Sequence, residues 1–96
     1  MRRAARIDGN HIEIVKEFRG YPGVSVLSLA AIGKGVPDLL VAFRGVTWLV
    51  EIKMGKGKQN AKQIKFANEW AGCCAVVRNS ADVDCVIKQM AALKKQ

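Results

Sequence analysis

The sequence lacks any long apolar run. Its longest stretch without a charged residue, residues 20–33, is interrupted by Pro22 and several glycines and is too short to span a bilayer. The basic pair Arg2-Arg3 precedes no apolar segment, so we expect no secretory signal. No segment has the amphipathic pattern of basic and aromatic residues that is typical of a membrane-surface helix. We therefore expect a protein that neither crosses nor binds a membrane.

The sequence also lacks paired cysteines. Cys73, Cys74 and Cys85 are odd in number and have neither CxxC nor zinc-ligand spacing. Cys73 and Cys74 lie in a strand-like segment, where we expect them to be buried as reduced thiols. This use of cysteine predicts a cytoplasmic protein. Internal repeats, linkers and low-complexity segments are absent from the sequence as well.

Acidic residues are scarce relative to basic ones. Eight Asp and Glu accompany sixteen Lys and Arg, which gives a net charge of +8. Such an excess suits the phosphate backbone of a nucleic acid, although charge that only keeps the protein soluble is the alternative. Half of the 96 residues are hydrophobic, which predicts a globular protein with a single domain over residues 1–96 and one modest core. Residues 1–6 are expected to form a basic N-terminal arm.

Two apolar segments predict a β-hairpin near the middle of the chain. Residues 36–43 and 46–53 are rich in Val, Leu, Ile, Phe and Trp, which favour strands. Arg44 and Gly45 lie between them and suit a two-residue turn. A turn at these two residues determines which residues of the two strands lie opposite each other.

This hairpin is expected to bring charged residues together. Asp38 and Glu51 should lie directly opposite each other, with Cβ atoms roughly 5 Å apart, and Lys53 should project to the same face. Two neighbouring carboxylates in an apolar hairpin repel each other, and a divalent cation such as Mg²⁺ or Mn²⁺ relieves that repulsion. The alternatives are that both acids are solvated at strand ends, or that Lys53 pairs with one of them. Because all three charges converge in so apolar a hairpin, we favour the metal site.

Periodicity predicts the remaining elements. Helices are expected over residues 8–19 and 59–71 and from Ser80 onward, with further strands over residues 24–30 and 73–78. The resulting order is helix, three strands, helix, strand, helix. It predicts an α/β (α+β) fold in which a small mixed sheet is flanked by helices.

Apolar stripes on these helices predict their buried faces. The first helix is expected to bury Ile12, Val15 and Phe18. Trp48 and Trp70 both lie on apolar stripes, so we expect them in the core rather than as base-stacking platforms. The later helices are expected to bury a second set of residues: Ile64, Ala67, Trp70, Ala71, Val83, Val86, Ile87, Met90 and Leu93.

The two strands of the hairpin carry the segments GVPDLLV (residues 35–41) and LVEIK (residues 49–53). Their PD and EIK motifs have the pattern of the PD-(D/E)XK nucleases. The GxPD form resembles the VRR-NUC group within that superfamily, particularly its short stand-alone, phage-type members. The resemblance covers about residues 7–81. It implies a restriction-endonuclease-like core, a Mg²⁺- or Mn²⁺-dependent endodeoxyribonuclease, and a phage or bacterial protein that acts in the host cytoplasm.

The predicted hairpin and the resemblance together indicate which residues are catalytic. Asp38 and Glu51 are expected to be metal ligands, and similar nucleases imply the Ile52 carbonyl as a further ligand. Lys53 is expected to orient or help deprotonate the attacking water and to offset charge on the phosphate. Gln63 lies in the helix after the motif, where VRR-NUC proteins carry a glutamine, and is a catalytic candidate that would hold a water or a phosphate. The alternative is an exposed helical glutamine.

The first helix offers further candidates. Similar nucleases have an acidic residue there, often with a glutamine three positions later, and Asp8 and His11 have this spacing with Asn10 between them. All three are candidate site residues by this resemblance. Capping of the helix by Asp8 or Asn10, and a surface or capping role for His11, are the alternatives. Glu13 and Glu17 are expected to be solvated helix charges, although Glu13 remains an alternative site residue.

Two glycine-lysine loops flank the hairpin, at residues 33–35 and 54–58. Backbone amides and mobile ammonium groups beside a metal site can hold a phosphodiester strand. The candidate DNA-binding residues are Lys34, Lys56, Lys58 and Lys62.

The expected partners are DNA and a second copy of the chain. A domain with one modest core gains stability by pairing, and a two-fold dimer presents two equal sites to a two-fold symmetric four-way junction. Stand-alone VRR-NUC proteins look like Holliday-junction resolvases, which implies branched DNA as substrate; Met90 and Leu93 of the final helix are a candidate dimer contact. The alternatives are a non-enzymatic basic nucleic-acid-binding domain, a non-selective nicking or degrading nuclease, and a structural or assembly protein.

Overall fold

The chain folds in the order α-β-β-β-α-β-α, as the sequence predicts. The computed structural model describes residues 9–93, and the bounds of the elements are α1 (Gly9–Arg19), β1 (Val24–Ser28), β2 (Leu39–Phe43), β3 (Val46–Ile52), α2 (Ala61–Glu69), β4 (Cys74–Val77) and α3 (Ser80–Leu93). Over these residues the strands form a mixed sheet in the order β1-β2-β3-β4, in which β3 and β4 are parallel and the other neighbours antiparallel. The predicted α+β fold class is confirmed. No helix within residues 9–93 is long and apolar enough to cross a membrane.

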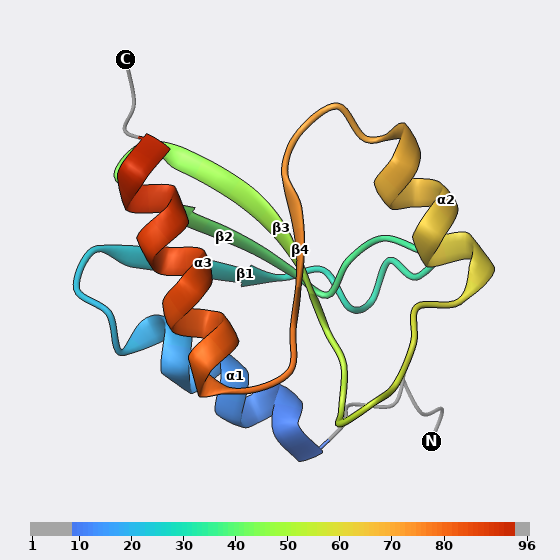
Figure 1. Cartoon of the computed structure of the whole chain (residues 1–96), viewed down its shortest axis with the longest axis horizontal. Coiled ribbons are helices and arrows are strands. Elements are labelled where there is room, and N and C mark those ends of the chain that lie inside the picture. Colours follow the sequence, from blue (N-terminus) through green and yellow to red (C-terminus); the bar gives the residue numbers. More distant parts are fainter. Residues whose placement is uncertain (1–8, 94–96) are drawn as a thin grey trace.

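In the described part of the chain, α1 and α3 pack against the strands, whereas α2 stands apart from them. Figure 1 shows α1 and α3 next to each other, while α2 stands apart on the right, beside the loop that joins β1 to β2. Side chains alternate between the faces of a sheet, so the side chains between the core residues point away from α1 and α3, and one of them, Glu51, contacts α2 through Gln63. The two faces therefore have different surroundings.

The central hairpin has the predicted register. Arg44 and Gly45 have φ values of 54° and 82°, the left-handed values that a type I′ turn requires at both central positions. Phe43 pairs with Val46 next to this turn, and the pairing continues to the other end of β2. A two-residue turn therefore positions every cross-strand pair, including those at the open end of the hairpin.

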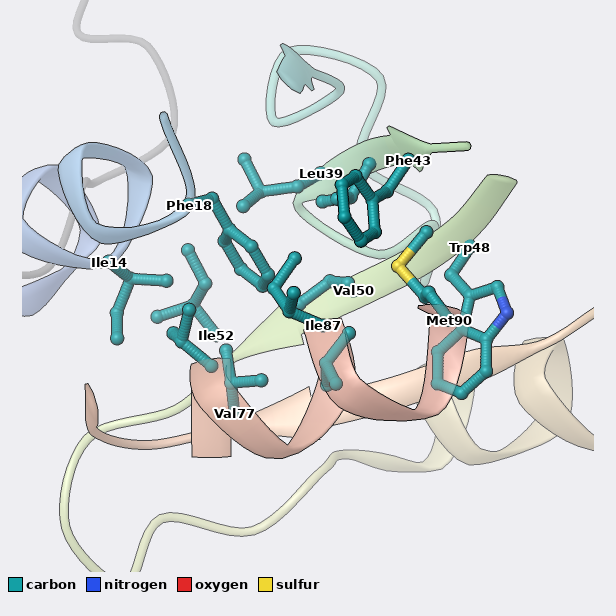
Figure 2. Packing of buried hydrophobic residues seen from close by; sticks show 13 residues of the cluster. Ile14, Phe18, Leu39, Phe43, Trp48, Val50, Ile52, Val77, Ile87 and Met90 are labelled. Atoms are coloured by element: carbon teal, nitrogen blue, oxygen red, sulfur yellow. The ribbon is translucent and has the colours of Figure 1, made fainter. Parts of the chain in front are cut away.

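The core lies between the sheet and the two helices α1 and α3. Figure 2 shows side chains from β2, β3, α1 and α3 pointing into one cluster. Full burial of each large apolar side chain contributes about 1.5–3 kcal/mol. The clustered buried residues are Ile14, Phe18, Leu39, Val41, Phe43, Trp48, Val50, Ile52, Val77, Val83, Val86, Ile87 and Met90.

The predicted stripe of α1 was correct at Phe18, correct in part at Val15 and wrong at Ile12. Ile14 and Phe18 are buried and Val15 is half-buried, but Ile12 is 57% exposed. Ile12 precedes Ile14 by two positions, which lie on nearly opposite sides of a helix, so only one of them can face the core. The buried face includes His11 instead. A pattern of apolar residues alone does not distinguish these two phases.

α2 was expected to bury an apolar stripe, and this was wrong. None of its residues is buried, and Ile64 is half-exposed. Trp70, just after the helix, is 48% exposed, so its expected place in the core is also wrong, whereas Trp48 is buried as predicted. The helix begins after Asn60, because the Asn60 side chain accepts a hydrogen bond from the backbone N–H of Gln63, and the Gln63 side chain accepts one from the backbone N–H of Asn60.

α3 buries four of the residues predicted for it, Val83, Val86, Ile87 and Met90, while Leu93 is half-exposed. Asn79 caps this helix, since its Oδ1 accepts a hydrogen bond from the N–H of Asp82 at 2.9 Å. Met90 is fully buried within the chain. It therefore cannot serve as the dimer contact that the sequence suggested.

The thiols are more accessible than expected. Cys73 precedes β4 and is exposed, and Cys74, the first residue of the strand, is only half-buried. The expected burial was therefore wrong for Cys73 and correct only in part for Cys74. The short strand β4 buries Val77 alone, so the length of the buried segment was overestimated.

Candidate active site

The open end of the hairpin brings the predicted carboxylates together. Pairing of Leu39 with Val50 carries the register to the next position, where Asp38 lies opposite Glu51. In this register that position is a non-hydrogen-bonded pair, in which opposing side chains approach most closely. The Oδ2 atom of Asp38 accepts a hydrogen bond from the N–H of Ile52 at 2.8 Å. The Asp38 carboxylate is thus tied to the end of β3.

Glu51 is a buried acid with an incomplete set of partners. Its side chain accepts a hydrogen bond at Oε2 from Nε2 of Gln63, at 2.8 Å, while Oε1 is buried with no hydrogen-bond partner. The residue is 4% exposed. Burial, followed by the nearby Asp38 carboxylate, raises the pKa of Glu51 from 4.5 to about 7, and Lys53 opposes this rise. Near neutral pH the Glu51 carboxyl is therefore only partly ionised, and an additional positive charge beside it would favour the ionised form.

Lys53 follows β3 and is fixed through its backbone. Its N–H donates to the carbonyl of Val77 at 3.1 Å, and its own carbonyl accepts from Nδ2 of Asn10 at 3.2 Å. Its Nζ atom lies 3.9 Å from Oε2 of Glu51. Contacts from β4 and α1 thus hold the backbone of Lys53, and the ammonium group lies beside the carboxylates.

Gln63 links α2 to the hairpin. Its Oε1 atom accepts from the N–H of Asn60 at 2.8 Å, which leaves Nε2 directed at Glu51. The helix cap and the site therefore share a single side chain, whose amide is held at both ends. The alternative of a free, exposed helical glutamine was wrong.

The first-helix candidates have different positions. Asn10 bonds Lys53 and its Oδ1 atom is buried with no hydrogen-bond partner, so it lies at the site but within α1 rather than as its cap. His11 is buried and lines a depression of about 380 Å³ together with Val15 and Ser28. Within residues 9–93 no hydrogen bond or ion pair joins His11 to the carboxylates. Asp8 lies outside the described residues.

The donor set at the end of the hairpin fits a hard divalent cation. Asp38, Glu51 and the Ile52 carbonyl supply oxygen atoms, the donors that Mg²⁺ and Mn²⁺ prefer. A cation would satisfy the unpartnered Oε1 of Glu51 and favour its ionised form. Residues 9–93 hold no group of three or more His, Cys, Asp or Glu that could hold a metal ion. The remaining ligands would therefore be carbonyl, water or substrate oxygens, which is usual for Mg²⁺.

Sequence reasoning missed the role of Arg78, which lies directly after β4. Its Nη1 atom donates to the carbonyls of Gly55 and Gly57 at 2.9 and 2.6 Å. These bonds hold the glycine-lysine loop that carries the exposed Lys56 and Lys58. Because β3 and β4 are parallel neighbours, the residues that follow them meet at one edge of the sheet, and this topology was the signal for the contact.

The other predicted lysines gather at the start of α2. A Cβ atom added to Gly35 would lie 2.5 Å from the backbone oxygen of Lys62, so only glycine allows the loop between β1 and β2 to approach the helix this closely. The approach brings exposed Lys34 near Lys62. With Lys65, Phe66 and Glu69 they line a depression of about 160 Å³.

Comparison with known proteins found no matching protein family, no matching curated protein and no matching solved structure. The resemblance to VRR-NUC nucleases therefore remains a hypothesis that rests on the motif. The geometry of the site supplies the independent argument for function.

Proposed function

We propose that this protein is a metal-dependent endodeoxyribonuclease that hydrolyses phosphodiester bonds in branched DNA, such as four-way junctions. The proposal is carried chiefly by the convergence of Asp38, Glu51, Lys53 and Gln63 at one end of the sheet. Lys53 lies 3.9 Å from Glu51, as the alternative of an ion pair requires, but a buried carboxylate with an unpartnered oxygen beside a second carboxylate is more typical of a functional site than of a structural ion pair. The excess of positive charge and the exposed lysines around the site agree with a polyanionic substrate.

Hydrolysis of a phosphodiester requires an oriented water and relief of the negative charge that develops on the phosphate. A bound divalent cation supplies Lewis-acid stabilisation of that charge. Asp38 and Glu51 would hold the cation, and Gln63 fixes the orientation of the Glu51 carboxylate through its hydrogen bond of 2.8 Å. Lys53 has its ammonium group on the same side, where it orients the attacking water and offsets charge on the phosphate.

A cleavage panel tests this function. Labelled duplex, flap, splayed-arm and four-way-junction DNA are incubated with the protein in Mg²⁺ or Mn²⁺, in chelator, and in Ca²⁺. Cleavage in Mg²⁺ or Mn²⁺, with the junction preferred, and no cleavage in chelator are the expected results. Ca²⁺ should support binding without turnover, because it activates water poorly. Binding without cleavage in every metal would instead support a non-enzymatic DNA-binding domain, and equal cutting of all substrates a non-selective nuclease.

We also propose that the working unit is a homodimer. A chain of 96 residues with one core cluster gains stability from a second copy, and two sites related by two-fold symmetry suit a four-way junction. Light scattering at several micromolar concentrations tests this separately from cleavage. A monomeric mass throughout would reject the dimer while leaving the catalytic proposal in place.

A further inference from the structure

Phe66 of α2 and Trp70, which follows the helix directly, form a pair of aromatic rings outside the hydrophobic core. The rings of Phe66 and Trp70 are stacked, with centroids 5.3 Å apart and an interplanar angle of 17°. Half of the surface of Trp70 is exposed, whereas Trp48 is 8% exposed within the cluster of Figure 2. The turn that follows the helix lies against the indole, since a Cβ atom at Gly72 would come within 2.8 Å of its Nε1. The exposed ring is therefore part of a preformed surface.

Positive charge borders the Phe66 side of this aromatic pair. Lys34, Lys62 and Lys65 line the depression of about 160 Å³ to which Phe66 also contributes. Glu69 is the acid in that lining, and Lys65 pairs with it at 3.1 Å. Two lysines remain to attract an anion. We call this set, Lys34, Lys62, Lys65, Phe66 and Trp70, the aromatic–lysine surface.

The aromatic–lysine surface is continuous with the catalytic residues. Gln63, Phe66 and Trp70 are spaced i, i+3 and i+7, so they follow one side of α2 and the turn after it. The first of them donates to Glu51. Phe66 is one helical turn farther along, and Trp70 lies roughly 10 Å from Gln63 along the helix axis. This is about the distance that a few nucleotides span.

We propose that the aromatic–lysine surface binds unpaired nucleotides next to the bond that is cut, with a base stacked on the Trp70 indole and the flanking phosphates near Lys34 and Lys62. This inference rests on the proposed nuclease function and specifies its substrate: DNA with a single-stranded or unstacked segment beside the cleavage point. Bases inside a duplex already stack on both faces, so the indole discriminates in favour of unpaired bases. A branch point supplies such bases.

A second copy of the chain suits this surface less well. A two-fold contact centred on the aromatic rings would bring the lysines of both copies toward each other, and like charges at an interface oppose association. DNA brings the opposite charge and a planar partner for the indole together. Charge complementarity therefore selects the nucleic acid.

Binding in chelator tests the proposal without requiring cleavage. Single-stranded oligonucleotides and duplexes of the same length are titrated by fluorescence anisotropy. Trp70→Leu is expected to weaken single-strand binding about tenfold and duplex binding less than twofold, because it removes a stacking platform while keeping an apolar side chain. Trp70→Phe should retain most of the affinity. Ile64→Ala is the matched control, since Ile64 is a half-exposed apolar residue on the same helix.

Intrinsic fluorescence gives a second measurement on the unmodified protein. Trp48 is buried, so quenching by an added oligonucleotide reports mainly on Trp70. Quenching by single strands and not by duplex is expected. An unchanged single-strand affinity of Trp70→Leu, an equal loss for both DNA forms, or a change of mass in place of a change of affinity would overturn the proposal. If Trp70 binds single strands but the protein cuts no DNA, only the nuclease function fails.

Discussion

α3 and α2 both carry apolar stripes, yet α3 packs against the sheet and α2 stands apart from it. α3 buries Val83, Val86, Ile87 and Met90 against the strands, while none of the residues of α2 is buried. Figure 1 shows α3 beside α1 and α2 standing apart. α2 is attached to the sheet by a polar contact, the hydrogen bond between Gln63 and Glu51. An apolar stripe therefore marks a core in one helix and an accessible surface next to the candidate site in the other.

The largest expected difference between the two helices is in stability. Met90→Ala should lower the free energy of unfolding by about 2–5 kcal/mol, because the fully buried side chain leaves a cavity. Ile64→Ala on α2 should change it by less than about 0.5 kcal/mol. Thermal melts of both variants measure the difference. Comparable losses would show that α2 is covered in the folded protein, for example by a second copy.

The buried carboxyl on the α2 side should make stability depend on pH. The pKa of Glu51 is raised from 4.5 to about 7, so its contribution to stability is complete below pH 4.5 and is lost as pH rises through 7. The melting temperature of the metal-free protein should therefore fall between pH 5 and pH 8, by at least about 5 °C. Glu51→Gln should remove this fall, because the amide does not ionise.

Addition of Mn²⁺ to the same thermal melts tests whether Glu51 binds a metal ion. At pH 8 it should raise the melting temperature of the unmodified protein and not that of Glu51→Gln, since a cation binds the ionised acid. A flat pH profile for the unmodified protein, or equal stabilisation of both proteins by Mn²⁺, would contradict the site at the end of the hairpin.

Gln63 connects α2 to the site, and its loss should reduce activity more than stability. Gln63→Ala removes the donor to Glu51 and half of the reciprocal cap with Asn60. We expect cleavage to slow by about 10–100-fold, as for other residues that orient a metal ligand. Gln59→Ala, the same change four residues earlier, is the control and should keep nearly full activity. Equal rates for the two variants would show that Gln63 only caps the helix.

The smallest predicted effect concerns the loop that Arg78 holds. Arg78→Ala frees the carbonyls of Gly55 and Gly57, so the loop lysines lose their fixed position, and DNA affinity should fall about two- to fivefold. Arg19→Ala is the matched control, because Arg19 also donates to a backbone carbonyl, that of Val26, and carries the same charge. Anisotropy titrations compare the two, and an equal loss would indicate an effect of net charge alone.

The hairpin was predictable from the sequence because its turn is local. Arg44 and Gly45 fix the register, and the register places Asp38 opposite Glu51 whatever the rest of the chain does. Contacts between distant segments were not predictable in this way. The bonds from Asn10 to Lys53 and from Arg78 to the glycine-lysine loop depend on how α1 and β4 meet β3.

The exposed side of the molecule was the least predictable. Helical periodicity identifies an apolar face without saying what covers it, so Trp70 was assigned to the core like Trp48. In α1 the same ambiguity led to Ile12 being predicted as buried in place of Ile14, while Phe18 was predicted correctly. Patterns predict which elements form more reliably than which of their faces the sheet covers.

The Lys53→Ala variant tests most directly whether the residues at the end of the hairpin catalyse DNA cleavage, because it should lose cleavage and keep DNA binding. Lys53 lies beside the carboxylates, while the exposed lysines of the flanking loops are placed to hold the phosphate backbone. With a labelled four-way junction in Mg²⁺ or Mn²⁺, the unmodified protein should cut, and the variant should cut at least about a hundredfold more slowly while its affinity in Ca²⁺ stays within a few-fold. Full cleavage by Lys53→Ala in either metal would contradict the account.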